Sequence, residues 1–78
     1  MGRDERYAEL ERLLAAARAG EGLTQAAVAE LLGKPQSFVS KYESGERRLD
    51  VVEFLRVCAA LGVNPKDIID RLELGHDR

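Results

Sequence analysis

Apolar residues recur every three or four positions along most of the chain, and no stretch alternates apolar and polar residues. This spacing is typical of amphipathic helices, so the sequence predicts an all-α fold with five helices. The first predicted helix ends at Gly20-Glu21-Gly22, where two glycines interrupt the pattern. Its apolar stripe consists of Tyr7, Leu10, Leu13, Leu14 and Ala17.

The second and third predicted helices are separated by a very short turn. Thr24 is a typical N-cap for a helix over residues 25–32, and Gly33 suits the left-handed conformation of a tight turn. Proline has a fixed φ that favours the first helical position, so a third helix is expected from Pro35 to about Ser44. We expect the second helix to bury Val28, Leu31 and Leu32.

The last two predicted helices also begin at recognisable caps. Asp50 and Glu53 have the spacing of a capping box, and Asn64 with Pro65 is typical of an N-cap followed by a first helical residue. The expected apolar stripe of the fourth helix is Val51, Phe54, Leu55, Cys58 and Leu61, and that of the fifth is Ile68, Ile69 and Leu72. We expect one domain over residues 1–78, with an ordered core at about 5–74 and a frayed polar tail at 75–78.

Length and composition exclude several classes of protein. The 78 residues are too few for two domains, and no apolar run approaches the ~20 residues of a membrane-spanning helix. One cysteine and one histidine exclude a disulfide scaffold and a zinc finger, so we expect no metal and no cofactor. The N-terminus is charged and lacks an apolar signal core, which favours a cytoplasmic protein.

Catalytic motifs are also missing from the pattern. Ser37 and Ser40 have no histidine within reach, and Gly20-Glu21-Gly22 is too short for a phosphate-binding loop, so an enzyme is not expected. The net charge of −2 argues weakly against a nucleic-acid partner, but the charge is unevenly distributed. Residues 24–48 contain four cations and three acids, whereas residues 49–78 contain four cations and six acids.

The third predicted helix has two different faces. If Val39 and Tyr42 point into the core, Ser37 and Lys41 point about 160° to 200° away from Val39, with Phe38 and Ser40 on the flanks. The outward face is therefore short, polar and cationic. Such a face suits a helix that enters the major groove of DNA, where it must approach base edges closely.

The residues around this helix resemble the lambda-repressor-like helix-turn-helix family, also known as the Cro/repressor or XRE group. The resemblance covers roughly Tyr7 to Leu74 and implies a compact five-helix DNA-binding domain with the helix-turn-helix at its second and third helices. The residues that carry it are Leu23-Thr24-Gln25, Ala29, Gly33, the run from Pro35 to Glu43, and Gly45, followed by Ala60-Leu61-Gly62.

The family resemblance also implies roles for individual residues. It assigns base reading to Gln36, Ser37, Phe38 and Lys41, and contacts with the DNA backbone to Gln25, Lys34, Ser40, Arg47 and Arg48. It further implies a structural ion pair between Arg18 and Glu43. Alternatives remain at five of these positions. Phe38 could pack on the second helix, Arg47 and Arg48 could belong to a solvated loop, Lys34 could have no contact with DNA, and Ser40 could serve only to finish a helix turn.

We expect the function to be sequence-specific binding of double-stranded DNA by a dimeric transcriptional regulator, most simply a repressor. A chain this small without disulfides or metal is often stabilised as an oligomer, and a two-fold dimer would bind a pseudopalindromic operator. The expected dimer interface is Ile68, Ile69 and Leu72. The alternative is a protein-interaction module that binds a protein partner through the fourth and fifth helices, which the acidic C-terminal segment favours.

Overall fold

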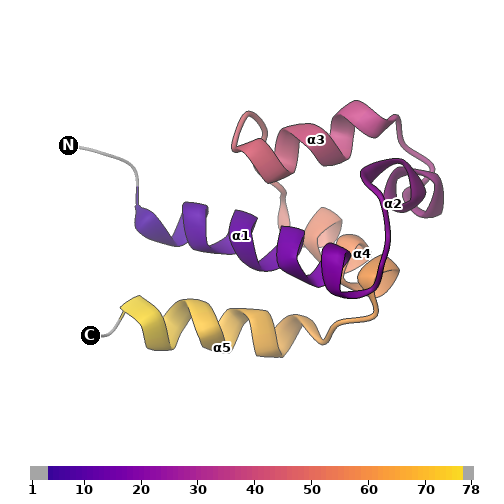
Figure 1. Cartoon of the computed structure of the whole chain (residues 1–78). Helices are drawn as coiled ribbons and strands as arrows, with labels where there is room; N and C mark the ends of the chain where they lie inside the picture. Colours follow the sequence, from indigo (N-terminus) through magenta and orange to yellow (C-terminus); the bar gives the residue numbers. More distant parts are fainter. Residues whose placement is uncertain (1–3, 77–78) are drawn as a thin grey trace.

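The computed structural model describes residues 4–76 and contains five helices and no strand within that range (Figure 1). This confirms the predicted fold class. The helices are α1 (Glu5–Gly20), α2 (Gln25–Leu32), α3 (Gln36–Ser44), α4 (Val51–Leu61) and α5 (Pro65–His76). Within the same range no helix is both long and apolar enough to cross a membrane.

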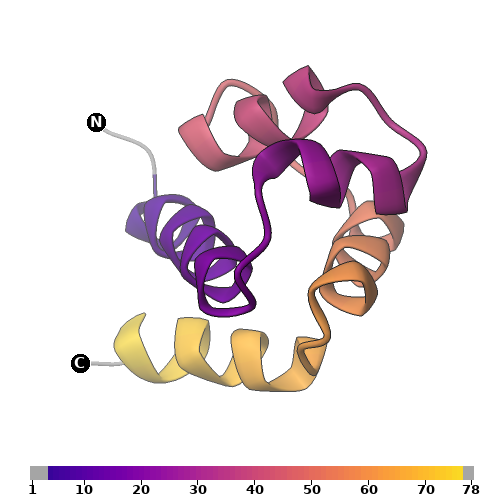
Figure 2. The same cartoon turned by 45° about the vertical axis from the view of Figure 1, so that its right-hand side comes forward.

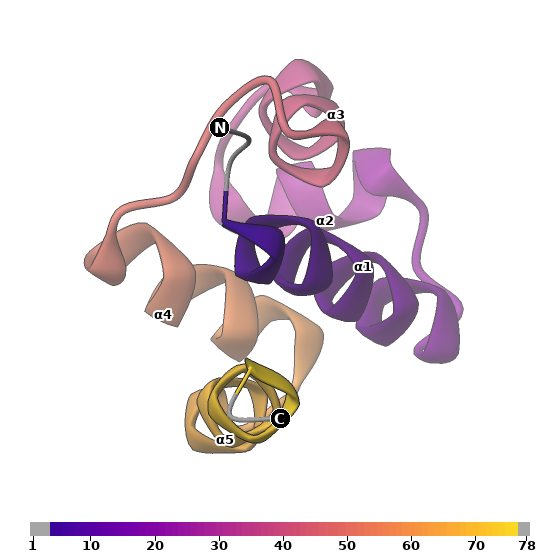
Figure 3. The same cartoon turned by 90° about the vertical axis from the view of Figure 1, so that its left-hand side faces the viewer.

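The helices form two groups around a single core. Helices α1 and α5 run side by side in opposite directions, as Figures 1 and 2 both show. The pair α2 and α3 packs together above α1, and α4 closes the remaining side (Figure 3). One face of α3 is thereby left on the outside of the molecule, away from α4 and α5.

Most of the helix boundaries follow from local capping interactions. The Thr24 hydroxyl accepts a hydrogen bond from the Ala27 N–H at 3.0 Å, and Asp50 and Glu53 form a complete capping box at the start of α4. Pro65 is the first residue of α5, as predicted. The prediction for Pro35 was wrong by one position, because it is the extended N-cap of α3 and the helix begins at Gln36.

The turn between α2 and α3 depends on Gly33. Its φ of 68° lies in the left-handed region that glycine adopts at little cost. The N–H of the following residue, Lys34, donates to the carbonyl of Ala29 at 2.9 Å and so satisfies a carbonyl in the last turn of α2. This turn fixes the direction in which α3 leaves α2.

The core draws residues from all five helices. Cys58 is fully buried, as its position in the helical pattern predicts. Helix α2 contributes Val28 and Ala29, and α3 contributes the two residues predicted to point inward, Val39 and Tyr42. The remaining buried residues are Leu13, Leu14, Val57, Leu61 and Ile68.

Several predicted core residues lie on the surface instead. Leu31, Val51 and Leu55 are exposed, whereas Ala29 and Val57 are buried in their helices. The two leucines lie about 100° from the middle of the buried face of their helices, where no neighbouring element covers them. Val51 is the first residue of α4 and has no preceding turn beside it.

The fifth helix differs from the prediction in two ways. Ile68 is part of the core, Leu72 is partly buried against it, and Ile69 is exposed, so the three aliphatic residues do not form one free surface. The helix also continues to His76, past the predicted end of the ordered core at residue 74. The rest of the predicted tail, residues 77–78, lies outside the described residues.

Candidate nucleic-acid interface

The outward face of α3 is a row of short polar side chains. Its exposed residues follow helical spacing and lie opposite Val39 and Tyr42, both of which are buried. Ser37 and Lys41 were expected there, and Ser40 was expected on the flank of this face. Ser44 was missed, although it lies seven residues after Ser37, which places it on the same face. We call Ser37, Ser40, Lys41 and Ser44 the α3 stripe.

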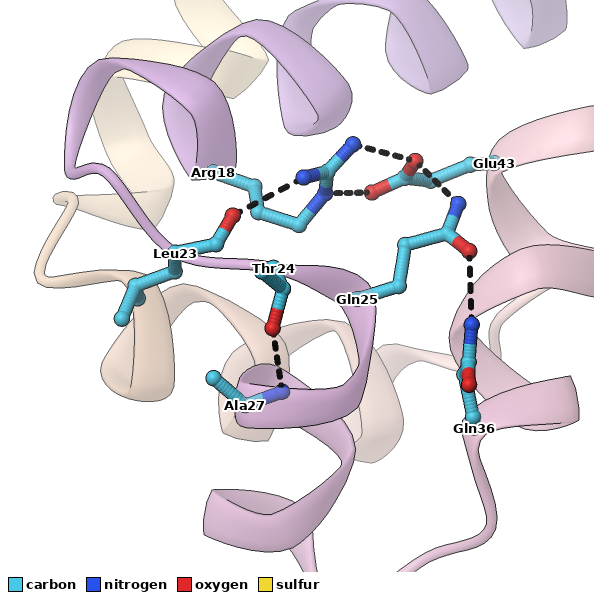
Figure 4. A network of polar contacts seen from close by, with 7 residues as sticks. All are labelled: Arg18, Leu23, Thr24, Gln25, Ala27, Gln36 and Glu43. Atoms are coloured by element: carbon cyan, nitrogen blue, oxygen red, sulfur yellow. Dashed lines mark hydrogen bonds and ion pairs between the residues drawn. The ribbon is translucent and has the colours of Figure 1, made fainter.

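An ion pair at the side of α3 joins this helix to α1. Arg18 Nε donates to Glu43 Oε2 at 2.7 Å, and Arg18 Nη2 donates to Glu43 Oε1 at 3.2 Å (Figure 4). The Arg18 Nη1 atom also donates to the carbonyl of Leu23 at 2.9 Å. The hydrogen bonds that Arg18 donates to the Glu43 carboxylate raise the pKa of Arg18. The implied ion pair is therefore confirmed, and it links α1, the start of α2 and α3.

The same carboxylate orients the first side chain of α2. Gln25 Nε2 donates to Glu43 Oε1 at 3.0 Å, and Gln36 Nε2 lies 3.5 Å from Gln25 Oε1 (Figure 4). A carboxylate only accepts hydrogen bonds, so the amide nitrogen of Gln25 must face Glu43 and its oxygen must face Gln36. The ion pair, Gln25 and Gln36 form one polar chain that leads from the core edge to the exposed first residue of α3.

Phe38 packs on the protein surface next to the core. Its ring meets the ring of Tyr42 edge to face, with 5.7 Å between centroids, and it is partly buried. The guanidinium of Arg47 lies 4.8 Å from the Phe38 centroid, and the ammonium of Lys34 lies 5.5 Å from it. These contacts favour the packing alternative for Phe38.

Arg47 is held by an acid from α4. Its two terminal nitrogens donate to Glu53 Oε1 and Oε2 at 2.9 Å and 2.7 Å. Hydrogen bonds from Arg47 and from the backbone N–H of Asp50 lower the pKa of Glu53 to about 2. The resemblance places Arg47 on the DNA backbone, but in this structure its charge is already paired within the loop and the capping box of α4.

Three cations near the α3 stripe, unlike Arg47, are not held by an acidic side chain of the described residues. Lys34, Lys41 and Arg48 are exposed and form no ion pair with any residue of the described range 4–76. The Arg48 guanidinium lies over the ring of Tyr7 with 4.0 Å to the centroid. The basic surface therefore consists of Lys34, Lys41 and Arg48, smaller than the sequence predicted.

The fold and this surface define a helix-turn-helix protein, and comparison with known proteins agrees. A helix-turn-helix family model matches residues 14–68, which is most of the chain. A solved XRE-family like protein from Pseudomonas syringae pv. tomato str. DC3000 is 48% identical, with a TM-score of 0.87 and coverage of 91% of this chain and 87% of that chain. The chain therefore belongs to the XRE family of helix-turn-helix proteins, which confirms the resemblance inferred from its sequence.

Two further solved structures are similar. The restriction-modification controller protein C.AhdI from Aeromonas hydrophila is 29% identical, with a TM-score of 0.74 and coverage of 80% of this chain and 94% of that chain. The clp gene regulator ClgR from C. glutamicum has a TM-score of 0.81 over 95% and 96% of the two chains, but at 23% identity it supports the fold alone. No curated protein sequence matches the chain significantly. The family is one of DNA-binding transcription regulators and not of enzymes.

Proposed function

We propose that this protein binds a specific sequence of double-stranded DNA by inserting α3 (Gln36–Ser44) into the major groove. We further propose that it acts as a homodimer on a pseudopalindromic operator and represses transcription in the cytoplasm. The observation that carries the proposal is the α3 stripe. Its short polar side chains lie opposite the buried Val39 and Tyr42, so that the helix can approach base edges without losing its place in the core.

Gln36 and Lys41 are the proposed base-reading residues with the longest reach. The contact with Gln25 uses one N–H of the Gln36 amide, so its second N–H and its oxygen can pair with N7 and N6 of an adenine. Lys41 would favour O6 and N7 of a guanine, and the shorter Ser37 would contact a neighbouring base edge. Phe38 takes a supporting role in this proposal, because its ring is engaged with Tyr42 and two cations.

Contacts with phosphates would set the position of α3 in the groove. The N-terminus of α2 at Gln25 offers backbone N–H groups and a positive dipole end to one phosphate. Lys34 and Arg48 lie near opposite ends of α3 in the sequence and would add cationic contacts, while Ser40 would donate from the stripe. Repression is the simplest consequence, because a dimer bound across a promoter would exclude the polymerase.

Selection from random duplex DNA tests the sequence-specific part of the proposal. The purified protein is expected to enrich a two-fold symmetric motif at near-physiological salt. Gln36→Ala is expected to relax the preference at one base position of each half-site, and Lys41→Ala at another. Lys66→Ala removes an exposed lysine of α5 and is the matched control, with the motif unchanged. A folded protein that enriches no motif would overturn the proposal.

In vitro transcription tests the repressor role. A template with the selected motif over its promoter should lose transcript as protein is added, and a template with a scrambled motif should not. Transcript that increases on the first template would identify an activator. Equal loss on both templates would mean that the effect does not depend on the operator.

A protein-interaction module is the second candidate function. Exposed apolar side chains on α4 and α5, among them Leu55, Ile69 and Leu74, favour a protein contact on these helices. The DNA selection separates the two candidates, because a module that only binds protein would enrich no motif. A contact between two copies of this chain would use the same kind of surface and remains compatible with DNA binding.

A further inference from the structure

Three exposed apolar side chains gather at the beginning of α4. The exposed fractions are 74% for Val51, 61% for Val52 and 47% for Leu55. Single exposed apolar residues are common on soluble proteins, but a group within two turns of one helix is a mark of a protein contact. We call these three residues the α4 patch.

The α4 patch lies beside the DNA-facing surface and not on it. In Figure 3 the beginning of α4 projects to the left, away from α1 and α2, while α3 lies at the top. A partner on this side would leave the α3 stripe uncovered. The loop before α4 carries Arg48, so the patch also adjoins the end of the proposed DNA surface.

We infer that the α4 patch is the surface through which two copies of this chain form the DNA-binding dimer, an inference that rests on the function proposed above. In a two-fold contact the same patch faces itself, so it must be apolar or carry both signs of charge. Arg56 and Asp50 border the patch, and Arg56 forms no ion pair with any residue between 4 and 76. Each Arg56 can therefore meet Asp50 of the other copy.

The size of the molecule fits a direct contact of this kind. Two recognition helices that enter successive major grooves lie about 34 Å apart. The principal extents of the chain are 36 × 26 × 21 Å. The required separation is comparable with the dimensions of one chain, so two copies in direct contact are large enough to span it without a linker.

This assignment replaces the surface expected from the sequence. Ile68 is buried in the core and Leu72 is partly buried against it, which leaves Ile69 as the exposed residue of that set. One isoleucine is a small contact compared with the three residues of the α4 patch. Ile69 is thus the best residue for testing the competing interface.

Sedimentation equilibrium of matched lysine variants tests the inference. Val52→Lys and Leu55→Lys are each expected to weaken dimerisation by about tenfold or more, because a charge would be buried in the contact. Leu31→Lys, which changes a leucine 62% exposed on α2, and Ile69→Lys are expected to leave it unchanged. All four positions are exposed, and circular dichroism confirms that each variant is folded.

Binding to DNA with one or two half-sites separates this inference from the function on which it rests. Monomeric variants should bind a single half-site as the wild type does and lose the extra affinity for two half-sites. A wild type that stays monomeric, or a dimer broken by Ile69→Lys and not by the α4 variants, would overturn the inference while half-site binding remains. Loss of half-site binding in the wild type would instead overturn the proposed function.

Discussion

Glu43 fixes the position of α3 by bonding to side chains of both α1 and α2. It accepts hydrogen bonds from Arg18 and Gln25, and its side chain is only 9% exposed. Glu43→Ala would leave the Arg18 guanidinium without its acceptor at a partly buried site. We expect the free energy of unfolding to fall by about 1–3 kcal/mol, measured by urea denaturation.

A surface ion pair provides the control for that measurement. Glu9 and Arg12 are one helical turn apart on α1, and the Arg12 side chain is 60% exposed. Glu9→Ala should cost less than about 0.5 kcal/mol, because exposed pairs contribute little. Equal losses in the two variants would show that the Arg18–Glu43 pair contributes no more than a surface pair.

Tyr42 gives a prediction at high pH. Burial raises its pKa to about 12, because the phenolate would lose its hydration in the core. Because folding raises this pKa above its ordinary value of 10, the neutral Tyr42 contributes fully to the free energy of unfolding below pH 10. That contribution is lost as the pH rises towards 12. Tyr42→Phe should therefore reduce the loss of stability above pH 10, measured by denaturation at each pH. Identical curves for wild type and Tyr42→Phe would contradict the assignment.

At the scale of elements, Glu53 stabilises the beginning of α4 through two different contacts. Glu53 closes the capping box by accepting from the Asp50 N–H at 3.0 Å, and it also holds Arg47 of the preceding loop. The pKa of Glu53 is lowered to about 2, so the ionised carboxylate contributes fully to the free energy of unfolding above pH 4.5, its ordinary pKa. That contribution is lost as the pH falls through about 2. We expect Glu53→Gln to destabilise the protein at pH 6 and to approach the wild-type stability near pH 2.

A double-mutant cycle identifies the partner responsible. Arg47→Ala should lower the free energy of unfolding at pH 6 in the same direction as Glu53→Gln, and the double variant should add little to either. Fully additive losses would show that the two side chains act independently.

Local sequence signals predicted the helices well, because each signal acts within a few residues. Thr24, the Asp50–Glu53 box and Gly33 each make their interactions within one helical turn, and all were identified from the chain. Exposure depends on which neighbours cover a helix, and the spacing of Leu31 and Leu55 carries no information about that. The pairing of Arg47 with Glu53 was missed for a similar reason, because it depends on how the loop folds against α4. From the sequence, Arg47 was assigned to the DNA backbone and Glu53 to the capping box alone.

At the scale of the whole molecule, pairing reduces the charge that is available for DNA. Residues 24–48 contain four cations and three acids. Glu43 is paired with Arg18, and Arg47 is paired with Glu53, so three cations and two acids remain in this segment. The chain as a whole carries a net charge of −2, so non-specific attraction to DNA should be weak. Specific affinity would then depend on a small number of phosphate contacts.

The salt dependence of operator binding measures how many such contacts form. Each phosphate neutralised on B-DNA contributes about −0.9 to the slope of log K against log salt. Arg48→Ala should reduce the steepness by about that amount, because its charge is not paired with an acid of the described residues. Arg47→Ala should leave the slope nearly unchanged and lower stability instead, because its charge is held by Glu53. An equal reduction in both variants, measured by fluorescence anisotropy over a salt series, would mean that Arg47 leaves Glu53 for a phosphate when DNA binds.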